Sequence, residues 1–324
     1  MARKAKIASR PGPAVSPTVG KRAAGGKVPE KSRLNRNLLI LSAILLLTIL
    51  VYARSLNNGF VAWDDPTNVY ENPFIRELSG ENLKTYFTKP LLAMYTPLVY
   101  LSFAVDYQIG GLDPRTYHTT NLILHLVNVS LVFMALWLLT RRTEIAAVAA
   151  LLFAVHPLNT AAVAPVSTRS TLLYALFFLA AFLAYIRYLQ TALKPRYIAV
   201  ALGLFLLALL SKSAAVVLPL VLILTDYYVG RTFDRRAIGE KIPFFALSLL
   251  FGILTFALRE DFGQIGTPLV FPPSTGFLSL PIRLPSIYSR CSSRLTSPHT
   301  IPIRSRSAVC SRSGSISPRW PSLR

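Results

Sequence analysis

The clearest candidate for chemistry in this sequence is a pair of adjacent carboxylates, Asp64 and Asp65, just beyond the first long apolar segment. The chain holds only 14 acidic residues in all. Such a pair could coordinate a hard divalent cation through oxygen, or one carboxylate could act as a general base beside the other. The alternative is an ordinary exposed turn, because Asp-Asp-Pro initiates turns readily. The spacing alone leaves these roles open.

A polar stripe follows one face of the second apolar segment. Its members recur at intervals of three, four and three residues: His118, Asn121, His125 and Asn128. At about 100° per residue they share one helix face, which in an apolar helix must face protein or a water-filled cavity. The two histidines lie about 10 Å apart along the axis, so they cannot chelate one ion together. The stripe is expected either to contact substrate or to bond to neighbouring helices.

Three more polar residues fall at the ends of apolar segments. His156 precedes Pro157, where a broken helix would free backbone groups for a ligand. Arg169 begins the next segment, and Lys212 separates two short ones. Both cations are predicted near the outer headgroups, on the side of the acid pair, where they suit a lipid phosphate. The alternative for each cation is simple snorkelling to the interface.

The composition places the chain among multi-span helical membrane proteins, since 52% of its 324 residues are hydrophobic and lie in long runs. A formal charge of +21 could suggest a nucleic-acid partner, but ten of the 35 Lys and Arg residues lie in the first 36 positions. Most others lie between the apolar runs, in the outer loop or in shorter connections. This distribution sets membrane topology and predicts no nucleic-acid binding. The two cysteines, Cys291 and Cys310, indicate neither a disulfide framework nor a metal cluster.

The expected fold is all-α, a polytopic transmembrane helical bundle of about seven spans with a large first outer loop. The spans are expected at 38–53, 118–139, 145–163, 171–189, twice within 197–228, and at 242–258. The outer loop, 54–117, holds seven of the 14 acidic residues, and its part 78–92 is expected to form an amphipathic interfacial helix. Nineteen Lys and Arg would then lie on the side of the N-terminus and seven on the other. The positive-inside rule therefore predicts a cytoplasmic N-terminus.

The sequence divides into three regions. Residues 1–37 are expected to be a disordered, basic cytoplasmic arm, and 38–258 a transmembrane domain. The tail, 259–324, is expected to be disordered or read from a shifted frame, because 262–324 contain no Lys, Asp or Glu but eight Arg and nine Pro. The expected location is a membrane, with a bacterial inner membrane favoured over the endoplasmic reticulum.

An ordered set of short motifs gives a resemblance to a known family. In chain order they are NGFVAWDD at 58–65, YTPL at 95–98, HTTNLILH at 118–125, FAVHPLNTAAV at 153–163, Arg169, and LSK at 210–212. The set resembles the membrane half of the transmembrane and TPR-repeat-containing O-mannosyltransferases and their bacterial relatives, which are type C glycosyltransferases. The resemblance covers about residues 38–258.

The resemblance implies transfer of a mannose-like sugar from a polyprenyl-phosphate donor to a protein or glycan acceptor. It implies that Asp64 or Asp65 is the catalytic base or a metal contact, with a divalent cation as the possible cofactor. It also implies that Arg169 and Lys212 hold the lipid phosphate. With these we group His118, Asn121, His125 and His156 as candidate substrate-binding residues.

The chain departs from the family pattern at four positions. The family usually has Arg where Thr96 stands, Glu where Ala161 stands, Asp where Thr171 stands and Glu where Ser213 stands. The family's helical repeats are also not found after the membrane part. The alternative is therefore a non-catalytic membrane protein, a degenerate or truncated copy that binds a lipid-linked sugar or acts as an assembly partner. A transporter is less favoured, because the intramembrane charges form no chain across the bilayer and no internal repeat is visible.

Overall fold

The computed structural model describes residues 30–90 and 94–261, and side chains within 34–90 and 94–258. In this part of the chain every regular element is helical, which confirms the all-α prediction. The described residues lie in the first of two units, Met1–Gly266. The second unit, Thr267–Arg324, lies outside the described residues, and so do most of the expected basic arm and nearly all of the expected tail.

Four stretches of the described chain are helical, long and apolar enough to cross a membrane: Leu34–Asn57, Pro114–Thr140, Arg169–Gln190 and Arg235–Leu258. They are built on α1 (Glu30–Tyr52), α4 (Pro114–Thr140), α7 (Arg169–Gln190) and α11 (Ile242–Asp261). Twenty-two residues at about 1.5 Å each reach about 33 Å, which matches a hydrocarbon core of about 30 Å. Helix α1 starts eight residues before the expected span, so the end of the expected arm is helical.

A fifth apolar stretch is bent by 58° between α5 (Thr143–Val155) and α6 (Pro157–Val163). The cause is local, because Pro157 has no N–H to give the carbonyl of Phe153, and the Leu158 N–H bonds to Nδ1 of His156 at 3.2 Å. Two carbonyls at the end of α5 therefore lose their helical donors. The Asn159 side-chain amide donates to the Phe153 carbonyl, and the His125 ring bonds to the Ala154 carbonyl at 3.0 Å. Side chains of the protein thus provide hydrogen-bond partners for both carbonyls at the break.

Two shorter apolar helices follow, as expected: α8 (Pro195–Ser211), and α9 (Leu218–Tyr228) entered through η4 (Ser213–Val217). The 17 residues of α8 reach about 25 Å, which is less than the core thickness. A short helix, α10 (Arg235–Gly239), leads into α11. By length and composition the described residues hold four spans, or five with the bent pair, so the count of seven stays a prediction.

The first outer loop is itself folded. It contains η1 (Ala53–Asn57), η2 (Pro66–Tyr70), η3 (Pro73–Ile75), α2 (Gly80–Thr88) and α3 (Pro97–Gly110). Buried side chains of this loop pack with Tyr117, at the start of α4, in one apolar cluster. Helix α2 occupies the segment expected to be an interfacial helix.

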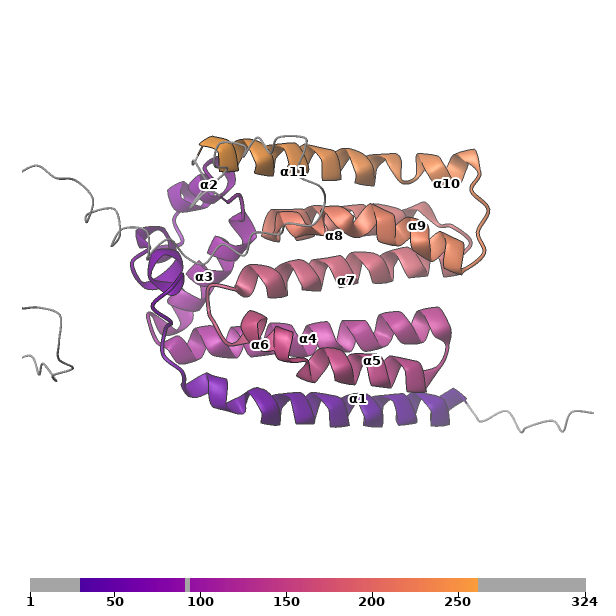
Figure 1. Cartoon of the computed structure of the whole chain (residues 1–324), viewed down its shortest axis with the longest axis horizontal. Coiled ribbons are helices and arrows are strands. Elements are labelled where there is room, and N and C mark those ends of the chain that lie inside the picture. Colours follow the sequence, from indigo (N-terminus) through magenta and orange to yellow (C-terminus); the bar gives the residue numbers. More distant parts are fainter. Residues whose placement is uncertain (1–29, 91–93, 262–324) are drawn as a thin grey trace, which may run out of the picture. The chain divides into compact units, whose positions relative to one another are not determined.

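The helices alternate in direction, so the chain brings its loops to two opposite ends of the bundle (Figure 1). Helix α7 packs against α4 and α8, and α4 also packs against α5. One end gathers the folded outer loop, the α5–α6 bend, the start of α7 and the α8–η4 turn. The other end carries the basic connections α4–α5, α7–α8 and α9–α10. The acid pair, Arg169 and Lys212 therefore share one end.

This arrangement predicts the membrane topology. In a chain whose two native cysteines are replaced by serine, Lys84→Cys on α2 should react with an impermeant maleimide from the non-cytoplasmic face. Lys194→Cys, between α7 and α8, should react from the cytoplasmic face, because the basic loops lie at that end. Labelling of both cysteines from one face would contradict the two-ended arrangement.

Candidate functional site

Asp65 is completely buried and joins two distant parts of the chain. One carboxylate oxygen accepts the Val61 N–H at 2.8 Å, and the other accepts the Ser167 N–H, also at 2.8 Å. Hydrogen bonds to an ionised carboxylate are stronger than neutral ones. Asp65 therefore fixes the outer loop to the residues that lead into α7, 102 positions along the chain.

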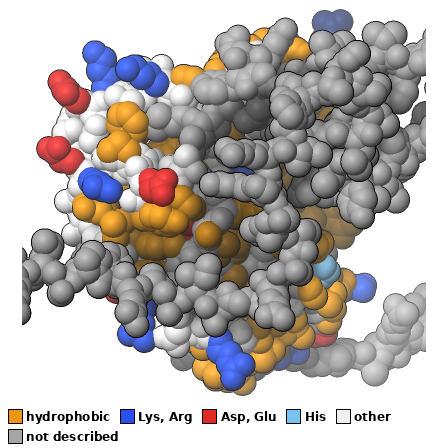
Figure 2. All heavy atoms as spheres, turned by 60° about the vertical axis from the view of Figure 1, so that its left-hand side comes forward, with side chains coloured by type: hydrophobic (Ala, Val, Ile, Leu, Met, Phe, Trp, Pro, Cys, Tyr) orange, Lys and Arg blue, Asp and Glu red, His pale blue; other side chains and the backbone are white. Residues whose placement is uncertain are grey.

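Asp64 differs from its neighbour in being exposed. Only its backbone carbonyl is engaged, by the Asn68 N–H at 3.1 Å and the Asn68 side-chain amide at 2.8 Å. Its carboxylate has no hydrogen bond or ion pair with the residues that the structure describes. Figure 2 turns this end of the bundle forward and shows acidic and basic side chains intermixed on its described surface. Of the two predicted acids, Asp64 is the one open to a ligand.

The acid pair does not by itself make a two-carboxylate cation site. Both oxygens of Asp65 already accept backbone N–H groups, which leaves them poorly placed to ligate a metal together with Asp64. Among the described residues no group of three or more His, Cys, Asp or Glu side chains could hold a metal ion. A divalent cation here stays a prediction that this geometry does not favour.

Arg169 is fully buried and neutralised within the protein. Its Nη1 lies 2.6 Å from the Asp106 carboxylate, Nε donates to the Asn121 side-chain oxygen at 2.8 Å, and Nη2 donates to the Tyr117 carbonyl at 3.0 Å. The guanidinium also lies 4.6 Å from the centre of the Phe103 ring. Direct contact between Arg169 and a lipid phosphate would require this packing to open. In this structure it joins α3, α4 and α7.

The partner of Arg169, Asp106, is not among the residues predicted from the sequence. It is buried in α3, where its other oxygen accepts the Thr120 hydroxyl at 2.7 Å. The sequence did contain an indication of this role, because an acidic residue such as Asp106 inside an apolar segment must be paired with another polar group. The sequence could not say which cation that partner is.

Lys212 keeps a charge that no described carboxylate compensates. It is partly exposed, its ammonium donates to the Thr171 hydroxyl at 2.8 Å, and it lies 6.0 Å from the centre of the Tyr174 ring. Burial lowers the pKa of the Lys212 ammonium relative to an exposed lysine. Of the two predicted phosphate ligands, Lys212 is the one available to bind an added anion.

Three members of the polar stripe bond to the backbone of neighbouring segments. Asn121 donates to the Pro165 carbonyl at 3.0 Å, and Asn128 donates to the Leu172 carbonyl at 2.9 Å. His125 bonds to the end of α5, as described above. These contacts favour the packing role for Asn121 and His125, and their contact with substrate stays a prediction.

The two other predicted histidines differ from each other. His118 is 1% exposed, and neither ring nitrogen has a hydrogen-bond partner in the described part of the chain. His156 is exposed beside the α5–α6 bend, and its Nδ1 is occupied by the Leu158 N–H. His118 is therefore shielded from a bulky ligand, whereas His156 presents its other nitrogen at the same end as Asp64.

A continuous series of contacts links the acid pair to Lys212. Asp65 binds the backbone of Ser167, Thr171 lies about one helical turn further along, and the Thr171 hydroxyl binds Lys212. An open carboxylate and an uncompensated ammonium are thus held by one framework. The Asp64 carboxylate could accept a proton, and the Lys212 ammonium could stabilise negative charge.

The buried ion pair yields the first stability prediction for this site. Asp106→Asn should destabilise the protein by about 3–5 kcal/mol, because it leaves the Arg169 charge buried and unpaired. Glu144→Gln is the matched control, since the Glu144–Arg36 pair spans 3.5 Å between side chains that are 73% and 55% exposed. It should cost less than about 1 kcal/mol. Equal unfolding midpoints in detergent for both variants would contradict the assigned role of Asp106.

A second prediction concerns His125. His125→Leu should lower unfolding stability by about 1–3 kcal/mol, because it strands the Ala154 carbonyl at the end of α5. Ile123→Leu, on the exposed face of the same helix, is the control and should leave the midpoint unchanged. A stable His125→Leu protein that fails to bind a lipid-linked sugar would instead assign His125 to substrate.

Comparison with curated proteins finds relatives named as O-mannosyl-transferases. Protein O-mannosyl-transferase TMTC3 of Homo sapiens is 36% identical over 163 residues, which cover 47% of this chain and 17% of that protein. Tmtc1 of Drosophila melanogaster is 34% identical over 242 residues, 71% of this chain and 27% of the relative. TMTC1 of Homo sapiens is 30% identical over 249 residues, 70% and 28% respectively.

No family model matches the chain, and no solved structure matches it. The chain spans 17% to 28% of the length of the three relatives named above. Matches to several members of one family, in a chain with apolar helices long enough to cross a membrane, confirm the resemblance drawn from the motifs. Over the part that matches, this chain is similar to the TMTC protein O-mannosyl-transferases and fits that family.

Proposed function

We propose that this chain carries the catalytic membrane part of a glycosyltransferase. In this proposal a mannose-like sugar passes from a polyprenyl-phosphate donor to a hydroxyl of a protein or glycan acceptor. The relatives' names support transfer of mannose to protein. The donor class rests on the resemblance to type C glycosyltransferases.

One observation carries the proposal: the buried Asp65 carboxylate ties the acidic loop to the start of α7, beside the turn that holds Lys212. This contact places an open carboxylate and an uncompensated ammonium at one end of the helices. In a lipid-linked sugar the phosphate lies at the membrane surface, where an ammonium can bind it. The sugar lies beyond the phosphate, where a carboxylate can accept the proton of the attacking hydroxyl.

The proposed step is a single displacement. Asp64 accepts the proton of the acceptor hydroxyl, whose oxygen attacks the anomeric carbon of the sugar. The bond from that carbon to the phosphate oxygen breaks, and its electron pair leaves with the polyprenyl phosphate. Lys212 stabilises the charge that develops on this leaving group. Attack opposite the leaving group inverts the anomeric centre.

The proposed location follows from the same arrangement. The site lies on the non-cytoplasmic side of a membrane, and the N-terminus is cytoplasmic, because the basic loops lie at the opposite end. A bacterial inner membrane remains the proposed setting in preference to the endoplasmic reticulum.

A non-catalytic donor-binding protein is the second candidate. It is favoured by the neutral Thr171 beside Lys212, where the family usually has an aspartate, and by the burial of Arg169. Such a protein would bind the lipid-linked sugar through Lys212 without using Asp64.

The two aspartates test the assignment of the base. In a full-length relative that carries the same residues, Asp64→Asn should reduce mannosyl transfer by about 10²- to 10⁴-fold without changing thermal stability. Asp65→Asn should reduce both transfer and stability, since an amide replaces a carboxylate between two N–H donors. Near-parent transfer by Asp64→Asn would favour the donor-binding protein.

Lys212 tests the phosphate contact. Lys212→Gln in this chain should weaken binding of polyprenyl phosphate mannose, and Lys212→Arg should restore much of it, because a cation is needed there. Lys84→Gln, which removes an exposed cation from α2 in the outer loop, is the matched control. Equal donor affinity in Lys212→Gln and the parent would remove Lys212 from the proposed site.

A further inference from the structure

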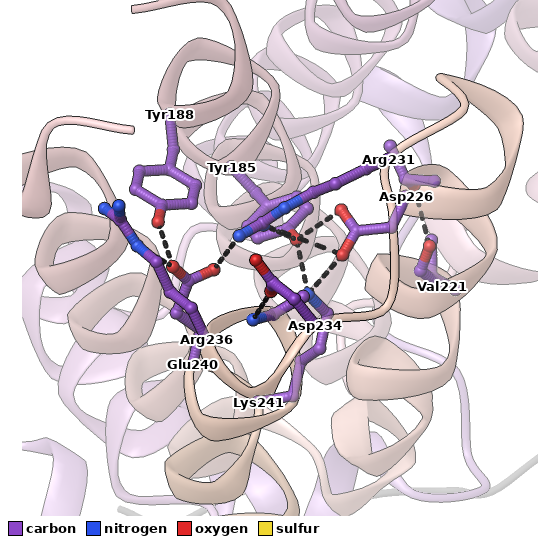
Figure 3. A network of polar contacts seen from close by, with 11 residues as sticks. Tyr185, Tyr188, Val221, Asp226, Arg231, Asp234, Arg236, Glu240 and Lys241 are labelled. Carbon is purple, nitrogen blue, oxygen red and sulfur yellow. Dashed lines mark hydrogen bonds and ion pairs between the residues drawn. The ribbon is translucent and has the colours of Figure 1, made fainter. Parts of the chain in front are cut away.

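A second polar network surrounds the α9–α10 connection, at the opposite, basic end of the helices (Figures 1 and 3). Its centre is Asp226, a fully buried carboxylate near the end of α9. Asp226 accepts the Tyr185 hydroxyl at 2.6 Å, pairs with the Lys241 ammonium, and lies 3.7 Å from the Arg231 guanidinium. The network therefore ties α9 and the start of α11 to α7.

The rest of this network compensates most of the nearby cations. Glu240 pairs with Arg231 at 2.8 Å and with Arg236 at 3.0 Å, and also accepts the Tyr188 hydroxyl. Arg235, in the first turn of α10, is different. It is exposed and has no hydrogen bond or ion pair with any residue that the structure describes.

Beside this network is an apolar cavity of about 490 Å³ between α9 and α10–α11. Its apolar lining includes Ile223, Phe233, Ile238, Phe245, Ala246 and Leu249. Lys241 also lines it, but its ammonium is engaged by Asp226 and Tyr185. The cavity therefore offers an apolar ligand a site without any charge that would have to be desolvated.

The cavity opens on the outer surface of the described helices. Several of its lining side chains are exposed, Phe233 by 50%, Ile238 by 57% and Leu249 by 66%. A helix is about 10–12 Å wide and rises about 5.4 Å per turn, so this volume holds about one turn of a partner helix. An extended hydrocarbon chain needs no such width. Size and lining therefore favour a lipid chain over a helix.

We propose that this cavity binds an acyl chain of an anionic glycerophospholipid, whose phosphate is held by Arg235. Charge complementarity supports the choice of headgroup. Arg235 lies two positions before Ala237, which lines the cavity, and is uncompensated. The other connections at this end of the helices are also basic, with Arg141, Arg142, Lys194 and Arg196. The site lies at the end opposite Asp64. Its ligand is therefore distinct from the donor of the proposed reaction, and this inference does not depend on that reaction.

The test is native mass spectrometry of the purified full chain in detergent with three probes. Dioleoylphosphatidylglycerol has chains and a net negative charge, dioleoylphosphatidylcholine has chains without net charge, and glycerol 3-phosphate has the charge without chains. We expect phosphatidylglycerol to bind about fivefold more tightly than phosphatidylcholine, and glycerol phosphate not to bind. Equal binding of the two phospholipids, or binding of glycerol phosphate as tight as that of phosphatidylglycerol, would overturn the proposal.

Two variants locate the site. Ala246→Trp obstructs the cavity and should weaken phosphatidylglycerol binding about tenfold, whereas Ala199→Trp, on an exposed position of α8, should change nothing. Arg235→Gln alters only an exposed side chain, so it should fold normally and remove the preference for phosphatidylglycerol. Parent-like binding by both Ala246→Trp and Arg235→Gln would overturn the proposal. So would a dimer that Ala246→Trp dissociates without any change in lipid binding, since a second copy would then be the occupant.

Discussion

The rest of this architecture depends on the buried ion pair between Arg169 and Asp106. A guanidinium with no exposed surface is tolerated only when its charge and its N–H groups are satisfied, and here α3 and α4 supply the partners. The need to pair the Arg169 guanidinium holds the start of α7 against the outer loop. Because Asp65 binds the backbone two residues before Arg169, the position of the acidic loop follows from the same junction.

The two ends of the helices use charge in different ways. At the loop end, Asp64 is open and Lys212 has only a neutral hydroxyl as partner, so both can respond to a ligand. At the basic end, Asp226 and Glu240 compensate nearly every cation around α10, and Arg235 alone remains uncompensated there among the described residues. Around α10, an anionic ligand would therefore meet Arg235 as the available cation.

Much of the fold could be predicted from the sequence, because apolar runs and Pro157 act locally. The long helices, the bend before Pro157 and the common end of Asp64, Arg169 and Lys212 all follow from hydrophobicity and charge order. The site was less predictable. No periodic pattern distinguishes Asp64 from Asp65 in an irregular loop, and the partner that neutralises Arg169 is set by tertiary packing between α3 and α7. The polar stripe was ambiguous because hydrogen bonding to a helix and to a ligand requires the same residue types.

The most direct test of the proposed site is to map where the donor phosphate binds. A polyprenyl phosphate mannose analogue with a photoreactive group beside the phosphate would be crosslinked to the purified chain and the labelled peptides sequenced. We predict labelling of 58–65, 164–171 and 210–213, the segments that Asp65 and Lys212 bring together. Labelling confined to 231–249, at the opposite end, would contradict the proposed site.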